Sequence, residues 1–302
     1  MSPYKTVIII AGPTAVGKTS VSIGLAQKFK TEIISADSRQ CYKELNIGVA
    51  RPTPEQLSEI THHFIASHSI HQEVTAATFE SCALEKTRKL FNTKDVVIIT
   101  GGTGLYIKAF TEGLDVIPQV PDHIRQQLND SYKQNGLSWL QSEVEKTDPQ
   151  FYSEGEIKNP HRLLRALEVI QFTGQSVMSF RTNKAKNRDF SILKIGLHLP
   201  KEQLHFNINE RVAMMMKQGL TDEVKSLLSY QHLKALQTVG YKELFSYFND
   251  EITLPIAIEE IKKNTRQYAK RQMTWFRKDK DYRWLPPDTD QVLQYLTTKL
   301  KI

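Results

Sequence analysis

The sequence predicts an α/β fold in which a parallel sheet is flanked by helices and interrupted by a mainly helical insertion. Two apolar runs, at 7–11 and 96–100, each lead into a glycine-rich turn that opens a helix. Polar helical patterns then replace strand-like runs until a further apolar run at 192–199. Strands that alternate with helices favour parallel pairing, and the late strand indicates that the chain re-enters the same sheet. We therefore expect a core made from residues 1–114 and 191–302, with the insertion at 115–190.

The first turn has the spacing G-x-x-x-x-G-K-T. It comprises Gly12, Pro13, Thr14, Ala15, Val16, Gly17, Lys18 and Thr19. The glycines permit a tight path, and the following helix directs its positive end at the same point. Lys18 is expected to reach a terminal phosphate and Thr19 to hold Mg²⁺. A glycine-rich surface loop would share this composition, but the strand and helix on either side favour a phosphate-binding loop within a P-loop NTPase-like sheet.

The next strand, at 32–36, runs directly into Asp37-Ser38-Arg39-Gln40. Ligands of parallel α/β sheets gather beyond the carboxyl ends of the strands, so Asp37 is expected beside the phosphate loop. The alternative is an Asp that caps a turn or a helix. Residues 52–72 are loop-like, and their four histidines lack the spacing of a metal site.

A helix at 79–91 and a strand at 95–100 precede the second turn, Gly101-Gly-Thr-Gly104. The strand ends without the acidic residue that closes it in many P-loop hydrolases, which argues against nucleotide hydrolysis as the main activity. The remaining chain after residue 199 is expected to be helical. Its last long helix, from Pro255 to Arg277, is basic, and its aromatic residues are expected in the core.

The composition fits a folded protein without a signal peptide or a membrane span, and therefore a cytoplasmic one. The chain has 302 residues, of which 40% are hydrophobic and 24% charged, and its net charge is +7. The interval from Lys262 to Arg283 holds nine basic residues against two acidic ones, a surplus as large as that of the whole chain. Such a concentration favours a polyanionic partner.

Five motifs together resemble the tRNA dimethylallyltransferase family, and the resemblance covers nearly the whole chain. The motifs are Gly12–Thr19, Ile34–Gln40, Gly101–Tyr106, Arg162–Val169 and Thr265–Arg277. One departure is Val49, in a Gly-Val-Ala-Arg-Pro segment where the family often has Gly-Thr-Ala-Lys-Pro. The resemblance implies transfer of a five-carbon allylic group to N6 of the adenine 3′ of the anticodon, with release of diphosphate.

The resemblance also implies roles on the donor side of this reaction. The diphosphate of dimethylallyl diphosphate would lie in the loop from Gly12 to Thr19, with Mg²⁺ on Thr19. Asp37 would be the general base that takes a proton from the adenine amine. Charge on the departing diphosphate would be stabilised by Lys18, Thr103 and Arg211.

On the acceptor side, the implied partner is the anticodon stem-loop of tRNA, whose adenine must turn out of its stack. The path of the base would be lined by Asp37, Ser38, Arg39 and Gln40. The insertion would hold the stem-loop through Arg125, His161, Arg162, Leu163, Leu164 and Arg165. The basic stretch would add general phosphate attraction. Because one tRNA already provides a large partner, we expect a monomer.

Three other functions compete with this interpretation. A P-loop kinase would consume ATP and would use Asp37 to deprotonate a hydroxyl group. An isopentenyltransferase for free adenine nucleotides would share the core motifs, but it would not need the insertion or the basic stretch. A catalytically silent tRNA-binding module would not need the complete phosphate loop together with Asp37 and Thr103.

Overall fold

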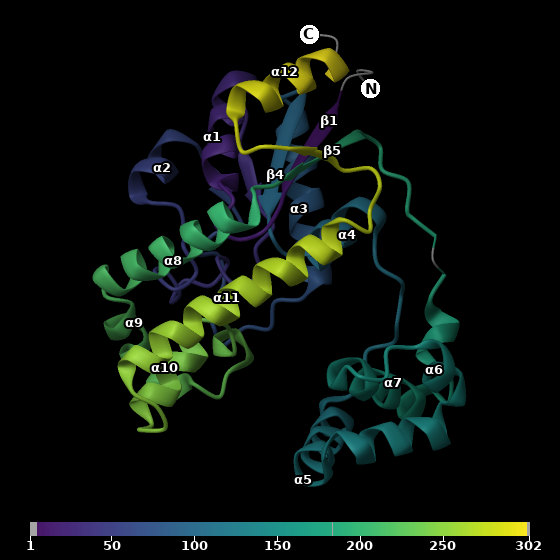
Figure 1. Cartoon of the computed structure of the whole chain (residues 1–302). Coiled ribbons are helices and arrows are strands. Elements are labelled where there is room, and N and C mark those ends of the chain that lie inside the picture. Colours follow the sequence, from purple (N-terminus) through teal and green to yellow (C-terminus); the bar gives the residue numbers. More distant parts are fainter. Residues whose placement is uncertain (1–4, 183, 301–302) are drawn as a thin grey trace. The chain divides into compact units, whose positions relative to one another are not determined.

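The computed structural model describes residues 5–182 and 184–300, which form two compact units (Figure 1). One unit contains the chain up to Glu112 and again from Asn187, and the other comprises Gly113–Lys186. Within the described residues, we find no helix with the length and apolar character needed to cross a membrane.

The first unit is built on a six-stranded parallel sheet with the order β3-β2-β4-β1-β5-β6. Its strands are β1 Thr6–Ala11, β2 Ile33–Ser35, β3 His62–His63, β4 Val96–Gly101, β5 Ser191–Leu197 and β6 Arg283–Leu285. The central strand β1 pairs with β4 and β5, so the strand that follows the insertion does return beside β1. The carboxyl ends of β1, β2 and β4 therefore share one edge of the sheet, where ligands of α/β proteins bind.

Helices cover both faces of this sheet. They are α1 Lys18–Phe29, α2 Pro54–Glu59, α3 Ala76–Phe91, α4 Gly104–Glu112, α8 Lys201–Lys217, α9 Leu220–Ser226, α10 Tyr241–Phe248, α11 Leu254–Phe276 and α12 Thr289–Leu300. Short 3₁₀ turns lie at Leu228–Tyr230 and Lys234–Leu236. The α8 and α11 helices run side by side in this unit (Figure 1).

The residues of β1 explain why helices cover both faces of the sheet, because alternate side chains of this strand enter two different hydrophobic cores. Val7 and Ile9 pack in a cluster with residues of α3, α4 and α10. Ile8 and Ile10 pack in a second cluster with residues of α1, α8 and α12. All four side chains are fully buried, as expected for a strand of a parallel sheet that is covered on both faces.

The second unit is helical and has a core of its own. It contains α5 Asp122–Thr147, α6 Pro149–Glu154, α7 Pro160–Thr173 and a 3₁₀ turn at Val177–Phe180. Asn159 caps α7 by accepting a hydrogen bond from the N–H of His161. Pro160 occupies the first turn, and Gly174 ends the helix in the left-handed region. The boundaries of α7 therefore follow ordinary capping rules. The fold class predicted from the sequence, a parallel sheet flanked by helices with a helical insertion, is confirmed.

Two local predictions are wrong. The segment predicted as loop, 52–72, contains α2, which begins at a capping box formed by Thr53 and Gln56, and the edge strand β3. The part of the chain after residue 199, predicted as helical throughout, contains β6. Both strands have two or three residues, too few for a periodic pattern to identify them.

Candidate active site

The phosphate loop joins β1 to α1 along a path that requires its glycines. Gly17 has a φ of 100°, in the left-handed region that favours glycine. A Cβ on Gly12 would lie 2.8 Å from the carbonyl oxygen of Leu197 on β5. The α1 helix begins directly after the loop, at Lys18, and no side chain caps its N-terminus. The positive end of this helix therefore faces the loop, as in other anion sites at helix N-termini.

Two cationic side chains lie at this loop. Lys18 Nζ donates hydrogen bonds to the carbonyl oxygens of Gly12 (3.0 Å) and Pro13 (2.7 Å). Arg211, on α8, donates from Nη1 to the Thr14 hydroxyl at 3.2 Å. Burial, followed by the Arg211 charge, lowers the pKa of Lys18 to about 7, although Asp37 acts in the opposite direction. An anion bound here would offset both the desolvation and the repulsion of the two cations.

Asp37 follows β2 and forms a turn with its own backbone. Its Oδ1 accepts hydrogen bonds from the N–H groups of Arg39 (2.8 Å) and Gln40 (3.2 Å). The two sequence interpretations of this residue are thus compatible, because Asp37 stabilises a turn and also lines the pocket described below. Both bonds end on the same oxygen.

The second glycine-rich turn, at the end of β4, contacts the Asp37 segment. Thr103 accepts a hydrogen bond on Oγ1 from the N–H of Ser38 at 3.0 Å. A Cβ on Gly101 would lie 2.1 Å from the carbonyl oxygen of Ala36. Close packing therefore explains Gly101, while Thr103 supplies the polar contact with the segment that carries Asp37.

The α11 helix provides site residues that the sequence motifs did not lead us to predict. Gln272 accepts a hydrogen bond from the Thr14 N–H and donates one to the Gly102 carbonyl oxygen, both at 2.9 Å. It thereby connects the phosphate loop to the second turn. Tyr268, one helical turn earlier, lines the pocket and interacts with Thr103, and burial raises its pKa to about 12. The sequence signal that could have identified them is their spacing of four residues within the Thr265–Arg277 motif, which places Tyr268 and Gln272 next to each other on one face of a helix.

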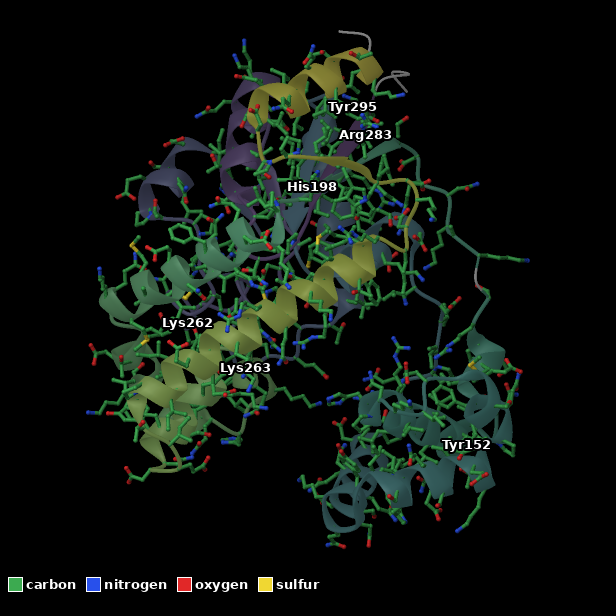
Figure 2. All side chains as sticks on the ribbon, viewed as in Figure 1. Tyr152, His198, Lys262, Lys263, Arg283 and Tyr295 are labelled. Carbon is green, nitrogen blue, oxygen red and sulfur yellow. The ribbon has the colours of Figure 1, made fainter. Side chains whose placement is uncertain are left out.

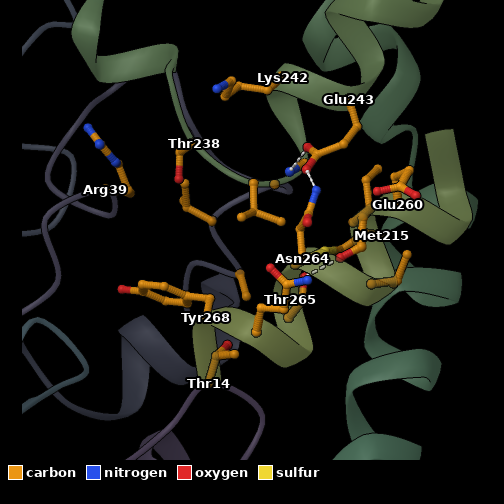
Figure 3. A pocket seen from close by; sticks show the side chains of 18 of the residues that line it. Thr14, Arg39, Met215, Thr238, Lys242, Glu243, Glu260, Asn264, Thr265 and Tyr268 are labelled. Carbon is orange, nitrogen blue, oxygen red and sulfur yellow. Dashed lines mark hydrogen bonds between the residues drawn. The ribbon is translucent and has the colours of Figure 1, made fainter. Parts of the chain in front are cut away.

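A pocket of about 740 Å³ brings these elements together (Figure 3). Its polar residues near the phosphate loop are Thr14, Asp37, Ser38, Arg39 and Arg211. Its apolar lining includes Val49, Ala50, Val212, Met215, Val239, Ile252 and Ile261. Glu243 supports another part of the wall, accepting hydrogen bonds from the Gly240 N–H (2.8 Å) and from Asn264 (2.7 Å), as Figure 3 shows. The pocket thus combines charged groups with an apolar surface.

Gln40, predicted to line the path of the base, supports the wall of this pocket through its amide. Its Nε2 donates to the carbonyl oxygens of Val49 (3.2 Å) and Ala50 (3.0 Å). Its Oε1 accepts a hydrogen bond from the Ser35 hydroxyl at 3.1 Å. Arg39 lines the pocket and reaches the Lys234 carbonyl oxygen at 3.4 Å.

The side chains at the phosphate loop are compatible with a Mg²⁺ ion that is coordinated mainly by a bound phosphate compound and water. Thr19 lies in the first turn of α1, next to Lys18. No group of three or more His, Cys, Asp or Glu side chains with metal-binding geometry occurs among the described residues. Because Mg²⁺ commonly takes few protein ligands together with phosphate oxygens and water, a single hydroxyl beside a phosphate loop fits this ion.

Comparison with known proteins assigns the family. The model of the family described as IPP transferase matches residues 40–279. The chain belongs to the IPP transferase family. The tRNA dimethylallyltransferase 1 of Bacteroides thetaiotaomicron is 47% identical over 292 residues, covering 96% of this chain and 95% of that protein. The tRNA dimethylallyltransferase of Christiangramia forsetii is 47% identical over 302 residues and 99% of both chains.

Solved structures of IPP transferases have the same fold. The full-length tRNA isopentenylpyrophosphate transferase of Bacillus halodurans is 31% identical, with a TM-score of 0.73 over 98% of this chain and 97% of that one. A eukaryotic dimethylallyltransferase, described as acting on tRNA, is 27% identical, with a TM-score of 0.71 over 90% of this chain and 70% of that one. The family-model match begins at Gln40, whereas these likenesses span nearly the whole chain.

The helical unit of this IPP transferase holds the remaining predicted RNA-binding residues. His161 and Arg162 are exposed on α7. Arg165 donates to Glu168 at 3.2 Å, and Arg125 Nε lies 3.7 Å from the same carboxylate. Leu163 and Leu164 are buried in the core of this unit. Their side chains lie on the apolar side of the helix, so the predicted RNA contact at these two positions stays a prediction that only the backbone could satisfy in this conformation.

The basic stretch lies largely on α11 and the segment after it. Lys262 and Lys263, labelled in Figure 2, pair with Glu259 (2.7 Å) and Glu260 (2.9 Å) one turn earlier. Beyond them, exposed cations continue at Lys270, Arg271, Arg277, Lys278 and Lys280. Trp275, predicted in the core, is 39% exposed, whereas its neighbour Phe276 is buried. The ring of Trp275 instead lies over Gly104, where a Cβ would be 2.2 Å away.

Proposed function

We propose that this IPP transferase moves the dimethylallyl group of dimethylallyl diphosphate to N6 of the adenine 3′ of a tRNA anticodon. One observation carries the proposal: a carboxylate, Asp37, and a cation, Arg211, line the same pocket beside a phosphate loop. Prenyl transfer to an amine requires an anion-binding site and a proton acceptor close together. The tRNA dimethylallyltransferase names of the relatives support the same activity.

On the donor side, the phosphate loop would bind the diphosphate. Lys18 and Arg211 would neutralise its charge, and Thr103 would contribute a hydroxyl group. Mg²⁺ on Thr19 would stabilise the charge that develops on the leaving group. The apolar wall of the pocket, formed in part by Val212 and Met215, suits a hydrocarbon chain.

On the acceptor side, the flipped adenine would present its exocyclic amine to Asp37. The lone pair of this amine is delocalised into the ring, so removal of its proton assists attack. The N6–C1 bond forms, the bond from C1 to the diphosphate oxygen breaks, and the electron pair leaves with diphosphate. The proton passes to Asp37, and we assign Oδ2 as the accepting oxygen because Oδ1 holds the turn.

The RNA would be held by the exposed His161 and Arg162, by Arg125 and Arg165, and by the basic stretch from Lys262 to Arg283. Ser38 and Arg39 would lie along the path of the base, with Gln40 behind them. We further propose that the protein works as a monomer in the cytoplasm.

Purified protein, Mg²⁺ and labelled dimethylallyl diphosphate test the proposal, with an unmodified anticodon stem-loop and AMP as competing acceptors. Label in the stem-loop, and little in AMP, is the expected result. Label in AMP alone would identify an adenine-nucleotide transferase. An absence of label from both acceptors, with ATP consumed in a parallel reaction, would support a kinase.

A further inference from the structure

A carboxylate outside the residues assigned so far holds one edge of the pocket wall. Glu223 lies on α9. Its Oε2 accepts hydrogen bonds from the N–H groups of Asn46 (3.2 Å) and Ile47 (2.7 Å). Its Oε1 accepts one from the N–H of Gly48 (3.0 Å) and one from the Tyr241 hydroxyl (2.5 Å). Four donors, three of them consecutive backbone groups, therefore converge on a single side chain.

The surroundings show that this contact is built for an anion. Successive backbone N–H groups that converge form a concave anion-binding site, here occupied by a side chain of the same protein. Tyr241 is fully buried, and burial together with Glu223 raises the pKa of its hydroxyl, which keeps it a donor. A Cβ on Gly48 would lie 2.6 Å from the Tyr241 ring, so this approach requires glycine.

A partly buried cation holds the carbonyl groups of the same loop. Arg51 donates from Nη2 to the carbonyl oxygens of Tyr42 (2.7 Å) and Lys43 (3.1 Å), and also to that of Leu45. The N–H groups of 46–48 are thus held by an anion, and the carbonyl groups of Tyr42, Lys43 and Leu45 by a cation. Charge-assisted hydrogen bonds are about twice as strong as neutral ones, so the path of this loop is firmly fixed.

The loop leads directly to the proposed base. Gly48, Val49 and Ala50 line the same pocket as Asp37. The carbonyl oxygens of Val49 and Ala50 accept the two hydrogen bonds from Gln40 Nε2, and the N–H of Gln40 donates to Asp37 Oδ1. Hydrogen bonds, joined by the backbone of 48–50 and by the Gln40 residue itself, therefore connect Glu223 to Asp37.

We propose that Glu223 is a positioning residue for the acceptor side of the site, fixing the 46–50 wall and, through Gln40, the orientation of Asp37. This inference rests on the proposed transfer to RNA. The hydrogen bonds of Glu223 go to Asn46, Ile47, Gly48 and Tyr241 and not to the phosphate loop, so its loss should change the transfer step and leave binding of the diphosphate group unchanged. A residue that only maintained the fold would affect both substrates together.

The first test compares Glu223→Gln with Asp222→Asn, which removes an adjacent exposed carboxylate. An amide presents NH₂ to the N–H groups it faces, so the loop shifts, and displacements of about 1 Å at a reacting centre cost about a hundredfold in rate. We expect Glu223→Gln to lower kcat with the stem-loop by about tenfold to a hundredfold and to lower the Tm by a few degrees, because its four hydrogen bonds weaken, with the KM for dimethylallyl diphosphate near wild type. Asp222→Asn should match the wild type.

Tyr241→Phe and Glu223→Ala keep the test decisive if Glu223→Gln folds poorly. Tyr241→Phe retains the ring against Gly48 and removes one of the four hydrogen-bond donors. It should therefore show a smaller loss of kcat with the stem-loop, again with the KM for dimethylallyl diphosphate near wild type. Glu223→Ala leaves the anion site vacant, and added acetate should restore part of its kcat, whereas chloride at equal ionic strength should not. Three results would overturn the inference: a wild-type kcat in Glu223→Gln, equal losses of affinity for the stem-loop and for dimethylallyl diphosphate, or no rescue of Glu223→Ala by acetate. A wild-type protein without transfer activity would instead overturn the proposed function.

Discussion

At the scale of single residues, the proposed chemistry depends on how the two oxygens of Asp37 are used. Oδ1 accepts the backbone hydrogen bonds that form the turn, at 2.8 and 3.2 Å. An Asn side chain retains an oxygen for these bonds and loses the charge needed to accept a proton. Structure and catalysis at this position are therefore separable by one substitution.

Asp37→Asn should lower kcat for transfer to the stem-loop by about two to four powers of ten, the usual contribution of a general base. The Tm and the affinity for dimethylallyl diphosphate should stay near those of the wild type. Rapid-quench measurement of label transfer provides the rate, and calorimetry provides the affinity. A variant with more than a tenth of the wild-type kcat would remove Asp37 from the role of base.

The two cysteines differ in environment, and this difference reports on the Asp37 turn. Cys41 is fully buried, and burial, followed by the charge of Asp37, raises the pKa of its thiol to about 12. Cys82 is exposed on α3. Because the thiolate is the reactive form, the Cys41 thiol is almost wholly protonated and unreactive at about pH 8.

Iodoacetamide should therefore modify Cys82 rapidly in the folded protein and reach Cys41 only after unfolding. Peptide mass spectrometry at successive times distinguishes the two sites. Equal rates of modification in the native protein would show that the 37–51 segment opens readily. A Cys82→Ser control should leave the native protein almost unlabelled.

At the scale of elements, the second glycine-rich turn is shaped by what packs on it. A Cβ added to Gly101 would lie 2.1 Å from the backbone carbonyl oxygen of Ala36, which cannot move without displacing Asp37. Gly104 lies under the partly exposed ring of Trp275. The two glycines therefore tolerate an added methyl group very differently.

Gly101→Ala should lower the free energy of unfolding by about 3 kcal/mol and should reduce transfer activity in the protein that remains folded. Gly104→Ala should cost about 1 kcal/mol or less, since the Trp275 ring can shift and Ala favours the start of α4. Urea unfolding of the two variants provides the comparison. Equal losses of stability would contradict the packing explanation.

The elements that could be predicted from the sequence are those with local signals. Apolar runs followed by glycine-rich turns predicted β1 and β4, and the run at 192–199 predicted β5. The two-residue strand β3 and the three-residue strand β6 carry no such pattern. Gln272 and Glu223 were missed because their partners lie 258 and about 176 residues away, and only the folded chain brings them together.

At the scale of the whole molecule, the uneven distribution of charge predicts how RNA binds. The positive surplus is concentrated between Lys262 and Arg283, where several cations are exposed while Lys262 and Lys263 pair with glutamates. Binding that neutralises phosphates releases counterions, so affinity falls as salt rises.

The affinity for the stem-loop should fall at least about a hundredfold between about 50 and 200 mM salt. Changing the exposed Arg277, Lys278 and Lys280 to Gln should reduce the slope of log Kd against log salt, whereas Lys225→Gln on α9 should not. Fluorescence anisotropy at a series of salt concentrations measures both slopes. A nearly flat dependence for the wild type would exclude the basic stretch from RNA binding.

Locating the transferred group tests the central claim most directly. After reaction of the wild-type protein with dimethylallyl diphosphate and the stem-loop, the RNA is digested to nucleosides and the modified base is identified by mass spectrometry, while released diphosphate is counted. The expected result is one diphosphate per dimethylallyl group, with every group on N6 of the adenine 3′ of the anticodon and none when that adenine is replaced by guanine. A group on another base, or diphosphate released without RNA modification, would contradict the proposed meeting of a flipped adenine and an allylic diphosphate at Asp37.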